Sequence, residues 1–239
     1  MTHLQKEVSF LRKVALTAGI SLIIMALAAF FSYGLVYGKL VVPGNANVTL
    51  NNILSSSQLF NAGIFGWLII LICDIIVSWC FYIILKPISK NLSLLGAWFR
   101  LTYVGILGIA ILNLIFVSIL TKKADYLSTF TTDQLQTYVM LFLEAFDFSW
   151  SIGLIIFGGH LLIVGYLVYR SDFIPKIISI LLLIGAISYM LIHLCYSFLP
   201  QLDSITGILE SILSVPMALG ELGFGIWLLV KGGKAPKSA

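Results

Sequence analysis

The sequence has 239 residues, of which 60% are apolar and only 10% are charged. Such a chain has too little polar surface to cover a water-soluble fold of this length, and its mean hydropathy of +1.06 places it in lipid. The formal net charge is +4, but there is no Gly-rich phosphate-binding loop and the basic residues flank apolar runs. These features exclude nucleotide and nucleic-acid binding.

Six apolar runs are long enough to cross a bilayer. A spanning helix needs about 20 apolar residues, because lipid offers the backbone no hydrogen-bond partners. The sequence therefore predicts an all-α fold, a six-transmembrane-helix bundle that forms one membrane domain over residues 1–239. In chain order the expected spans are about 13–37, 60–86, 95–121, 138–169, 174–199 and 209–231.

The basic residues predict the orientation of these spans. Only Lys39, Lys122 and Lys123 fall on one side of the predicted membrane. The other eleven share the opposite side: Lys6, Arg12, Lys13, Lys86, Lys90, Arg100, Arg170, Lys176, Lys231, Lys234 and Lys237. Because Lys and Arg accumulate in cytoplasmic loops, we expect a multi-pass protein of the cytoplasmic membrane with both termini in the cytoplasm. Arg100 is interpreted as such an anchor, with contact to a lipid phosphate as the alternative.

Ionisable side chains also occur inside the predicted spans. Asp74, His160 and Glu221 each lie about 15–18 Å from the basic residue at the cytoplasmic end of their helix, counted at 1.5 Å per residue. They therefore share one layer near the middle of the bilayer. Asn113, about 20 Å beyond Arg100, is expected to join them. An unpaired ionisable group there costs about 2.5–3.5 kcal/mol, so these side chains should face the bundle interior.

A second polar group is predicted nearer the outer rim. The same count places Glu144, Asp147 and His193 there. Asp147 and His160 lie on one helix but are turned roughly 140° from each other, so they are not expected to form one site.

Short stretches spread over nearly the whole chain carry a family resemblance. They are Val42-Pro43-Gly44, Asn52-Ile53-Leu54, Asp74, Leu85-Lys86-Pro87, Asn91-Leu92, Phe99-Arg100, Phe142-Leu143, Asp147, Gly153-Leu154, Phe157-Gly158, His160, Gly165-Tyr166-Leu167, Tyr169-Arg170-Ser171, Phe173-Ile174-Pro175, Gly220-Glu221 and Trp227-Leu228-Leu229. In these the chain resembles the bacterial six-helix membrane proteins of domain of unknown function 4386. The resemblance implies the topology and no activity. Similar sequences often have a histidine before the aspartate at 147, where this chain has Phe146.

Several functions fit the layer of Asp74, His160 and Glu221. The favoured one is a proton or ion site in a membrane protein that binds or transports a small solute or ion, its other partners being membrane lipids. In an alternative, the three side chains bind a divalent metal and the protein hydrolyses a lipid-like substrate. No HExxH or paired-histidine spacing supports that enzyme. In a third, the layer only fixes helix packing in a non-enzymatic partner subunit.

Overall fold

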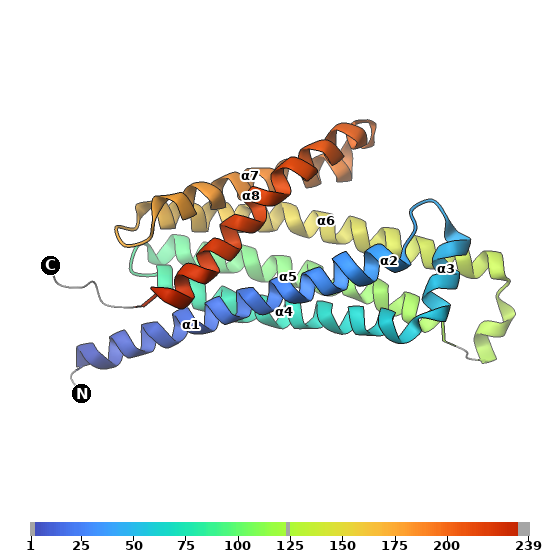
Figure 1. Cartoon of the computed structure of the whole chain (residues 1–239), viewed down its shortest axis with the longest axis horizontal. Coiled ribbons are helices and arrows are strands. Elements are labelled where there is room, and N and C mark those ends of the chain that lie inside the picture. Colours follow the sequence, from blue (N-terminus) through green and yellow to red (C-terminus); the bar gives the residue numbers. More distant parts are fainter. Residues whose placement is uncertain (1–2, 123–124, 234–239) are drawn as a thin grey trace. The chain divides into compact units, whose positions relative to one another are not determined.

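The computed structural model describes residues 3–122 and 125–233, which contain helices and no strand. Six segments are long and apolar enough to cross a membrane (Figure 1). They are Gln5–Leu40, Ser57–Leu85, Lys90–Leu120, Thr132–Arg170, Lys176–Phe198 and Pro200–Val230. Each overlaps one predicted span, so the prediction of an all-α fold with six spans is confirmed.

The first span changes helix type along its length, and the last begins with a short 3-10 turn. In chain order the elements are α1 (His3–Ala29), the π-helix η1 (Phe30–Tyr37), α2 (Gly38–Leu40), α3 (Ala46–Ser55), α4 (Ser57–Leu85), α5 (Lys90–Leu120), the 3-10 helix η2 (Asp125–Thr129), α6 (Thr132–Arg170), α7 (Lys176–Phe198), the 3-10 helix η3 (Pro200–Leu202) and α8 (Asp203–Val230).

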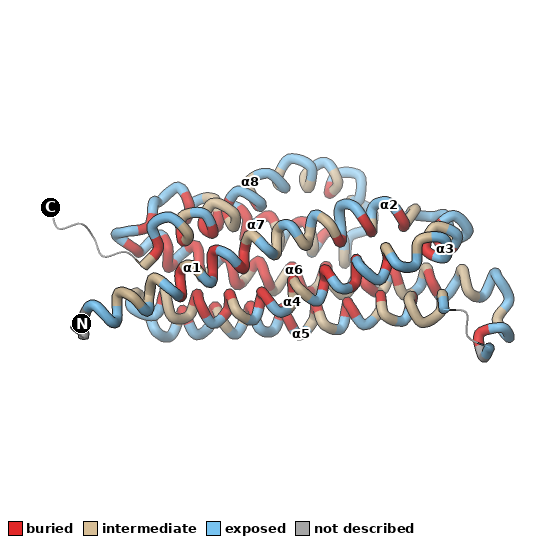
Figure 2. The backbone as a smooth tube through the Cα atoms, turned by 60° about the horizontal axis from the view of Figure 1, so that its bottom comes forward, coloured by how far each residue is buried: buried red, intermediate tan, exposed pale blue. Residues whose placement is uncertain are grey.

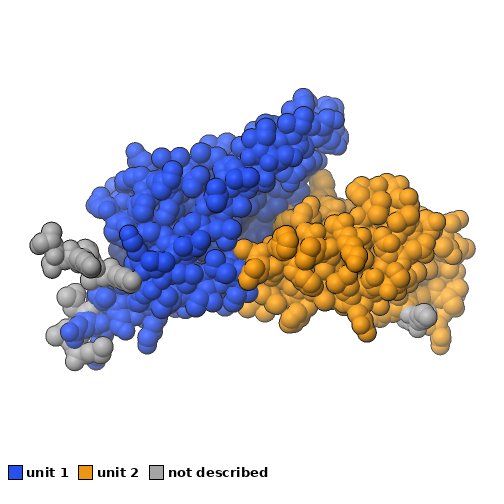
Figure 3. Space-filling view, viewed as in Figure 1, with its two compact units in different colours: residues 1–24, 73–104, 151–239 blue, residues 25–72, 105–150 orange. Residues whose placement is uncertain are grey.

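Contacts between residues divide the chain into two compact units (Figure 3). Unit 1 consists of residues 1–24, 73–104 and 151–239, and unit 2 of residues 25–72 and 105–150. Helices α1, α4, α5 and α6 contribute residues to both units.

Buried and exposed residues alternate along the helices (Figure 2), and large apolar side chains are found among both. In unit 1, Trp98, Ile177, Ile187 and Ile212 are among the most exposed side chains. A soluble protein rarely exposes large apolar side chains in such number, whereas lipid solvates them. The exterior of the helices is therefore suited to a bilayer.

Glycines permit close helix contacts in unit 1. A Cβ added at Gly158 of α6 would lie 2.8 Å from the Ala186 carbonyl oxygen of α7, and one at Gly19 of α1 would lie 2.8 Å from the Gly225 oxygen of α8. Without a hydrophobic driving force inside lipid, helices associate through such van der Waals contact between small residues. These contacts hold α6 against α7 and α1 against α8.

Arg12 of α1 caps the end of α8. Its Nη1 donates to the carbonyl oxygens of Leu228 (3.0 Å) and Gly232 (2.8 Å), and its Nη2 donates to that of Leu229 (2.5 Å). The last carbonyls of a helix have no partner within the helix, and a cation there also compensates the negative end of the helix dipole. The beginning and the end of the described chain therefore meet at one end of unit 1.

Replacing Arg12 by glutamine should lower the free energy of unfolding by about 1.5–3 kcal/mol, the usual contribution of hydrogen bonds to a charged group. The neighbouring exposed Lys13 provides a matched control, since Lys13→Gln removes the same charge without removing the cap. Thermal unfolding of both variants in detergent, followed by circular dichroism, makes the comparison. Equal stability of the two variants would contradict the capping role.

Aromatic packing dominates the interior of unit 2. The ring of Trp67 lies 4.9 Å from that of Trp150 and 5.3 Å from that of Phe146, and Tyr33 lies 4.9 Å from Trp150. The π-helix η1 brings Tyr33 and Tyr37 into a stacked pair at 5.6 Å. Edge-to-face and offset contacts of this kind stabilise a core beyond the area that they bury.

The segment between α2 and α3 turns sharply in unit 2. Gly44 adopts a positive φ of 73°, which side chains rarely tolerate, and Asn45 then caps α3 by accepting a hydrogen bond from the Val48 amide (3.1 Å). The Thr49 hydroxyl accepts a hydrogen bond from the Val42 amide and donates one to the Val42 carbonyl oxygen, which holds the two ends of the turn together. This turn positions α3 beside the beginning of α4.

Candidate functional site

Arg100 of α5 is the central side chain of a polar cluster in unit 1. It is fully buried, with 0% of its surface exposed. Its Nε donates to Oδ1 of Asp74 on α4 at 2.8 Å, and its Nη2 lies 2.5 Å from the same oxygen. Because Asp74 is equally buried, this is an ion pair between two helices inside the protein.

His160 of α6 contacts the same guanidinium. Its Nε2 lies 3.1 Å from Arg100 Nη1, and its Nδ1 lies 2.8 Å from the carbonyl oxygen of Gly96 on α5. Arginine has only donors and a carbonyl oxygen only accepts, so Nε2 must accept and Nδ1 must carry the proton. The bonding partners therefore assign His160 to the neutral form, as an acceptor for the arginine.

Two phenylalanines cover the arginine and the histidine. The guanidinium carbon of Arg100 lies 5.7 Å from the ring centre of Phe81 and 5.2 Å from that of Phe157. The His160 ring is stacked with Phe81 at 6.0 Å and lies 5.7 Å from Phe157. Aromatic faces attract a cation through the ring quadrupole, which offsets part of the cost of removing the guanidinium from water.

Glu221 of α8 completes the cluster more loosely. Its Oε1 lies 3.9 Å from Arg100 Nη1, beyond hydrogen-bonding distance, and 22% of its side chain is exposed. The second oxygen of Asp74, Oδ2, is buried and has no hydrogen-bond partner among the described residues. The cluster thus contains one tight ion pair, one loosely attached carboxylate and one unpartnered carboxylate oxygen.

The interpretation of Arg100 as a basic anchor at the cytoplasmic end of its helix is wrong, and so is the alternative of contact with a lipid phosphate, because the side chain is fully buried. Helix α5 begins at Lys90, five residues before the predicted span, so Arg100 lies ten residues, or about 15 Å, along the helix. That is the depth counted for His160 and Glu221. Counting from Lys90 as the anchor would have revealed a basic residue in the same layer.

The earlier start of α5 also removes the reason for placing Asn113 in the layer of Asp74, His160 and Glu221. From Lys90 it lies about 35 Å along α5, well past the layer. Asn113 belongs to unit 2, where its amide donates to the Ile109 oxygen of its own helix at 3.0 Å.

The predicted outer group is divided between the two units. In unit 2, Asp147 accepts a hydrogen bond from the Tyr37 hydroxyl at 2.6 Å, and Glu144 is exposed on the same helix. His193 belongs to unit 1, where its Nδ1 lies 2.9 Å from the Ser151 hydroxyl oxygen. These residues therefore form separate local contacts, and the depth count alone could not assign their partners.

The donor set around Arg100 is poorly suited to a divalent metal. Asp74, His160 and Glu221 all approach the guanidinium, whose positive charge offsets one of the two carboxylate charges, so the one negative charge that remains cannot balance a divalent ion. No cluster of three or more His, Cys, Asp or Glu side chains with metal-binding geometry occurs in residues 3–122 and 125–233.

Comparisons with known proteins identify a family and name no activity. Residues 17–232 match the model of the family described as "Domain of unknown function (DUF4386)". An uncharacterised protein of the archaeon Archaeoglobus fulgidus is 30% identical over 171 residues, which cover 72% of this chain and 84% of the relative. No solved structure matches the chain. With nine-tenths of its length covered by the family model, the chain belongs to the family of domain of unknown function 4386.

Proposed function

We propose that the protein binds and moves a small solute or ion across the membrane, and that the cluster around Arg100 exchanges one proton or monovalent cation during this cycle. Glu221 is the exchanging group in the proposal. Asp74 holds the arginine, and His160 positions it as a neutral acceptor.

The charge of the cluster supports this proposal. Arg100 contributes one positive charge and His160 none, while Asp74 and Glu221 contribute two negative charges when both are ionised. A net negative charge inside a low-dielectric interior is costly, and one bound proton or monovalent cation removes it. The cluster is therefore neutral only when it carries one such cation.

The position of Glu221 is the observation that carries the proposal. Asp74 is fully buried and is held at 2.5–2.8 Å, whereas Glu221 is partly exposed and lies 3.9 Å from the guanidinium. Of the two carboxylates, Glu221 can gain or lose a cation without breaking the buried ion pair.

The proposal retains the orientation predicted from the basic residues, in the cytoplasmic membrane with both termini in the cytoplasm. Arg100 is buried and leaves the cytoplasmic count, which falls from eleven residues to ten against three. The bias still supports the orientation.

A structural role is the second candidate. Arg100 joins α4, α5 and α6 through Asp74 and His160, which would also suit a subunit that only needs a rigid bundle. The two candidates differ in one respect, because only the exchange site requires Glu221 to change its protonation or its bound cation.

The test is proton flux into liposomes that contain the purified protein and a trapped pH-sensitive dye. Wild type should admit protons after an external acid pulse, and Glu221→Gln should reduce this flux to that of protein-free liposomes. Glu210→Gln is the matched control, since Glu210 lies on the same helix and bonds Tyr196 instead of the cluster.

The proposal also requires that the purified protein in solution binds about one proton per chain, and that the Glu221→Gln variant does not bind this proton. Proton flux after an acid pulse should also be compared in Na⁺ buffer and in K⁺ buffer. A lower flux in one of them would show that this cation competes with the proton. Wild-type liposomes that admit neither protons nor these cations, or a Glu221→Gln variant with full flux, would overturn the proposal in favour of the structural role.

A further inference from the structure

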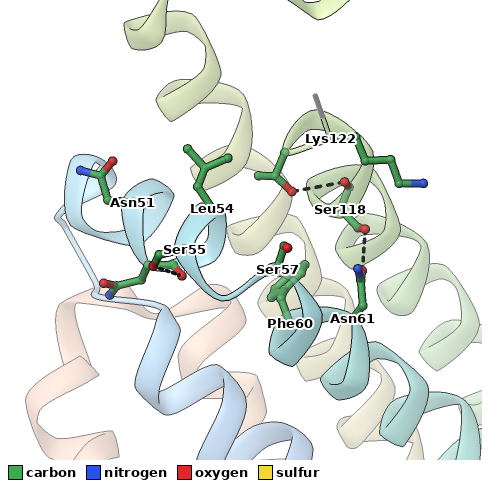
Figure 4. A pocket seen from close by; sticks show the side chains of 10 residues that line it. Asn51, Leu54, Ser55, Ser57, Phe60, Asn61, Ser118 and Lys122 are labelled. Atoms are coloured by element: carbon green, nitrogen blue, oxygen red, sulfur yellow. Dashed lines mark hydrogen bonds between the residues drawn. The ribbon is translucent and has the colours of Figure 1, made fainter. Parts of the chain in front are cut away.

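A cavity of about 810 Å³ lies in unit 2, between α3, the beginning of α4 and the end of α5 (Figure 4). Small-molecule sites usually have volumes of about 300–1,000 Å³, so this cavity is large enough for a ligand of the size of a sugar. It belongs to the end of α4 that is remote from the Leu85–Lys90 turn. The site is independent of the function proposed above.

The lining is polar but almost uncharged. Three of its ten residues carry amides and four carry hydroxyls, while no carboxylate is present. Among the described lining residues Lys122 alone is charged, and Figure 4 shows its ammonium directed away from the other side chains. A cation would find no countercharge in this lining, and an anion would find only that rim lysine.

Several polar atoms of the lining remain available to a ligand. The Ser118 hydroxyl donates to Asn61 Oδ1 at 2.7 Å, which uses the amide oxygen and leaves the Asn61 NH₂ group. Asn51 donates its NH₂ group to Asn47 at 2.9 Å, which leaves its oxygen as an acceptor. Within the described parts of unit 2, no hydrogen bond occupies the Ser57 hydroxyl.

This combination matches a hydroxyl-rich ligand. Each hydroxyl both donates and accepts, and amides and hydroxyls of the protein offer both functions at neutral charge. Phe60 adds a buried apolar surface at the beginning of α4, suited to the carbon–hydrogen face of a sugar ring. We infer that this cavity binds a neutral polyhydroxylated group, either a free sugar or polyol or the headgroup of a glycolipid.

The test uses the full chain in nanodiscs of phosphatidylcholine, prepared with a sugar-free detergent so that no glucoside occupies the cavity. Saturation-transfer NMR with D-glucose and with trehalose should show transfer to sugar protons. Ser57→Phe fills the cavity, and Asn61→Leu removes its free amide; each should raise the dissociation constant about tenfold or more. Gln58→Phe is the matched control, because Gln58 is exposed beside Ser57 but does not line the cavity.

The lipid source is tested by native mass spectrometry after incubation with glucosyl-diacylglycerol or phosphatidylcholine. If wild type retains the glycolipid and Ser57→Phe does not, the site binds a lipid headgroup. If wild type binds the sugar but does not retain the glycolipid, the site binds a free solute. D-Gluconate binding at least tenfold tighter than D-glucose, and dependent on Lys122, would replace the inference with an anion site. Equal results for wild type and Ser57→Phe with every probe would overturn it.

Discussion

Replacing Arg100 by glutamine is expected to lower the free energy of unfolding by about 3–5 kcal/mol, the usual cost of breaking a buried ion pair from one side. The loss arises because Asp74 would keep a fully buried charge whose closest partner is gone. Thermal or denaturant unfolding in mixed micelles measures it. Arg170→Gln is the control, since Arg170 is an exposed residue in the last turn of α6.

The double variant Arg100→Gln with Asp74→Asn removes both charges of the pair. It should recover about half or more of the stability that Arg100→Gln loses. With both residues neutral, no unpaired charge stays buried, so the effects of the two substitutions are not additive. Under the exchange proposal the recovered protein still lacks proton flux, since Glu221 has lost its guanidinium. A double variant no more stable than Arg100→Gln would show that the two residues do not act as a pair.

Replacing His160 by leucine should cost about 2–6 kcal/mol, because it leaves one N–H of Arg100 and the Gly96 oxygen buried without this partner, at about 1–3 kcal/mol each. The apolar contacts with Phe81 and Phe157 are largely kept, so the loss reports the two hydrogen bonds. The same unfolding measurement applies.

His193→Leu provides the comparison within unit 1. His193 has one side-chain hydrogen bond, to Ser151, and it is only half-buried. Its replacement should cost about 1 kcal/mol, the typical net contribution of one such bond. If His160→Leu were as stable as His193→Leu, the neutral acceptor role assigned to His160 would be untenable.

The fold followed from the sequence because lipid imposes a simple rule. Each span must satisfy its own backbone and present about 20 apolar residues, so the six runs were recognisable without knowledge of their packing. The helix ends were less certain. The beginning of α5 at Lys90 is five residues earlier than predicted, and this error determined how Arg100 was interpreted.

The members of the cluster were only partly predictable. Helix rise gives depth, which grouped Asp74, His160 and Glu221 as a layer, but rotation about each helix axis depends on packing. The two hydrogen bonds of His160 that fix its tautomer require the coordinates of Gly96 and Arg100. The cavity at Ser57 was equally beyond prediction, because the end of α5 that completes its walls is about 60 residues from α3 and the beginning of α4 in the chain.

The cap that Arg12 forms on α8 has a consequence for biogenesis. Its partner Gly232 is 220 residues further along the chain, and ribosomes add about 5–20 residues per second, so some 10–45 s pass before that carbonyl is synthesised. During this interval the Arg12 guanidinium lacks the α8 carbonyl oxygens that it binds in the folded protein. Closure of unit 1 by this cap is therefore a late event, which follows the synthesis of residue 232.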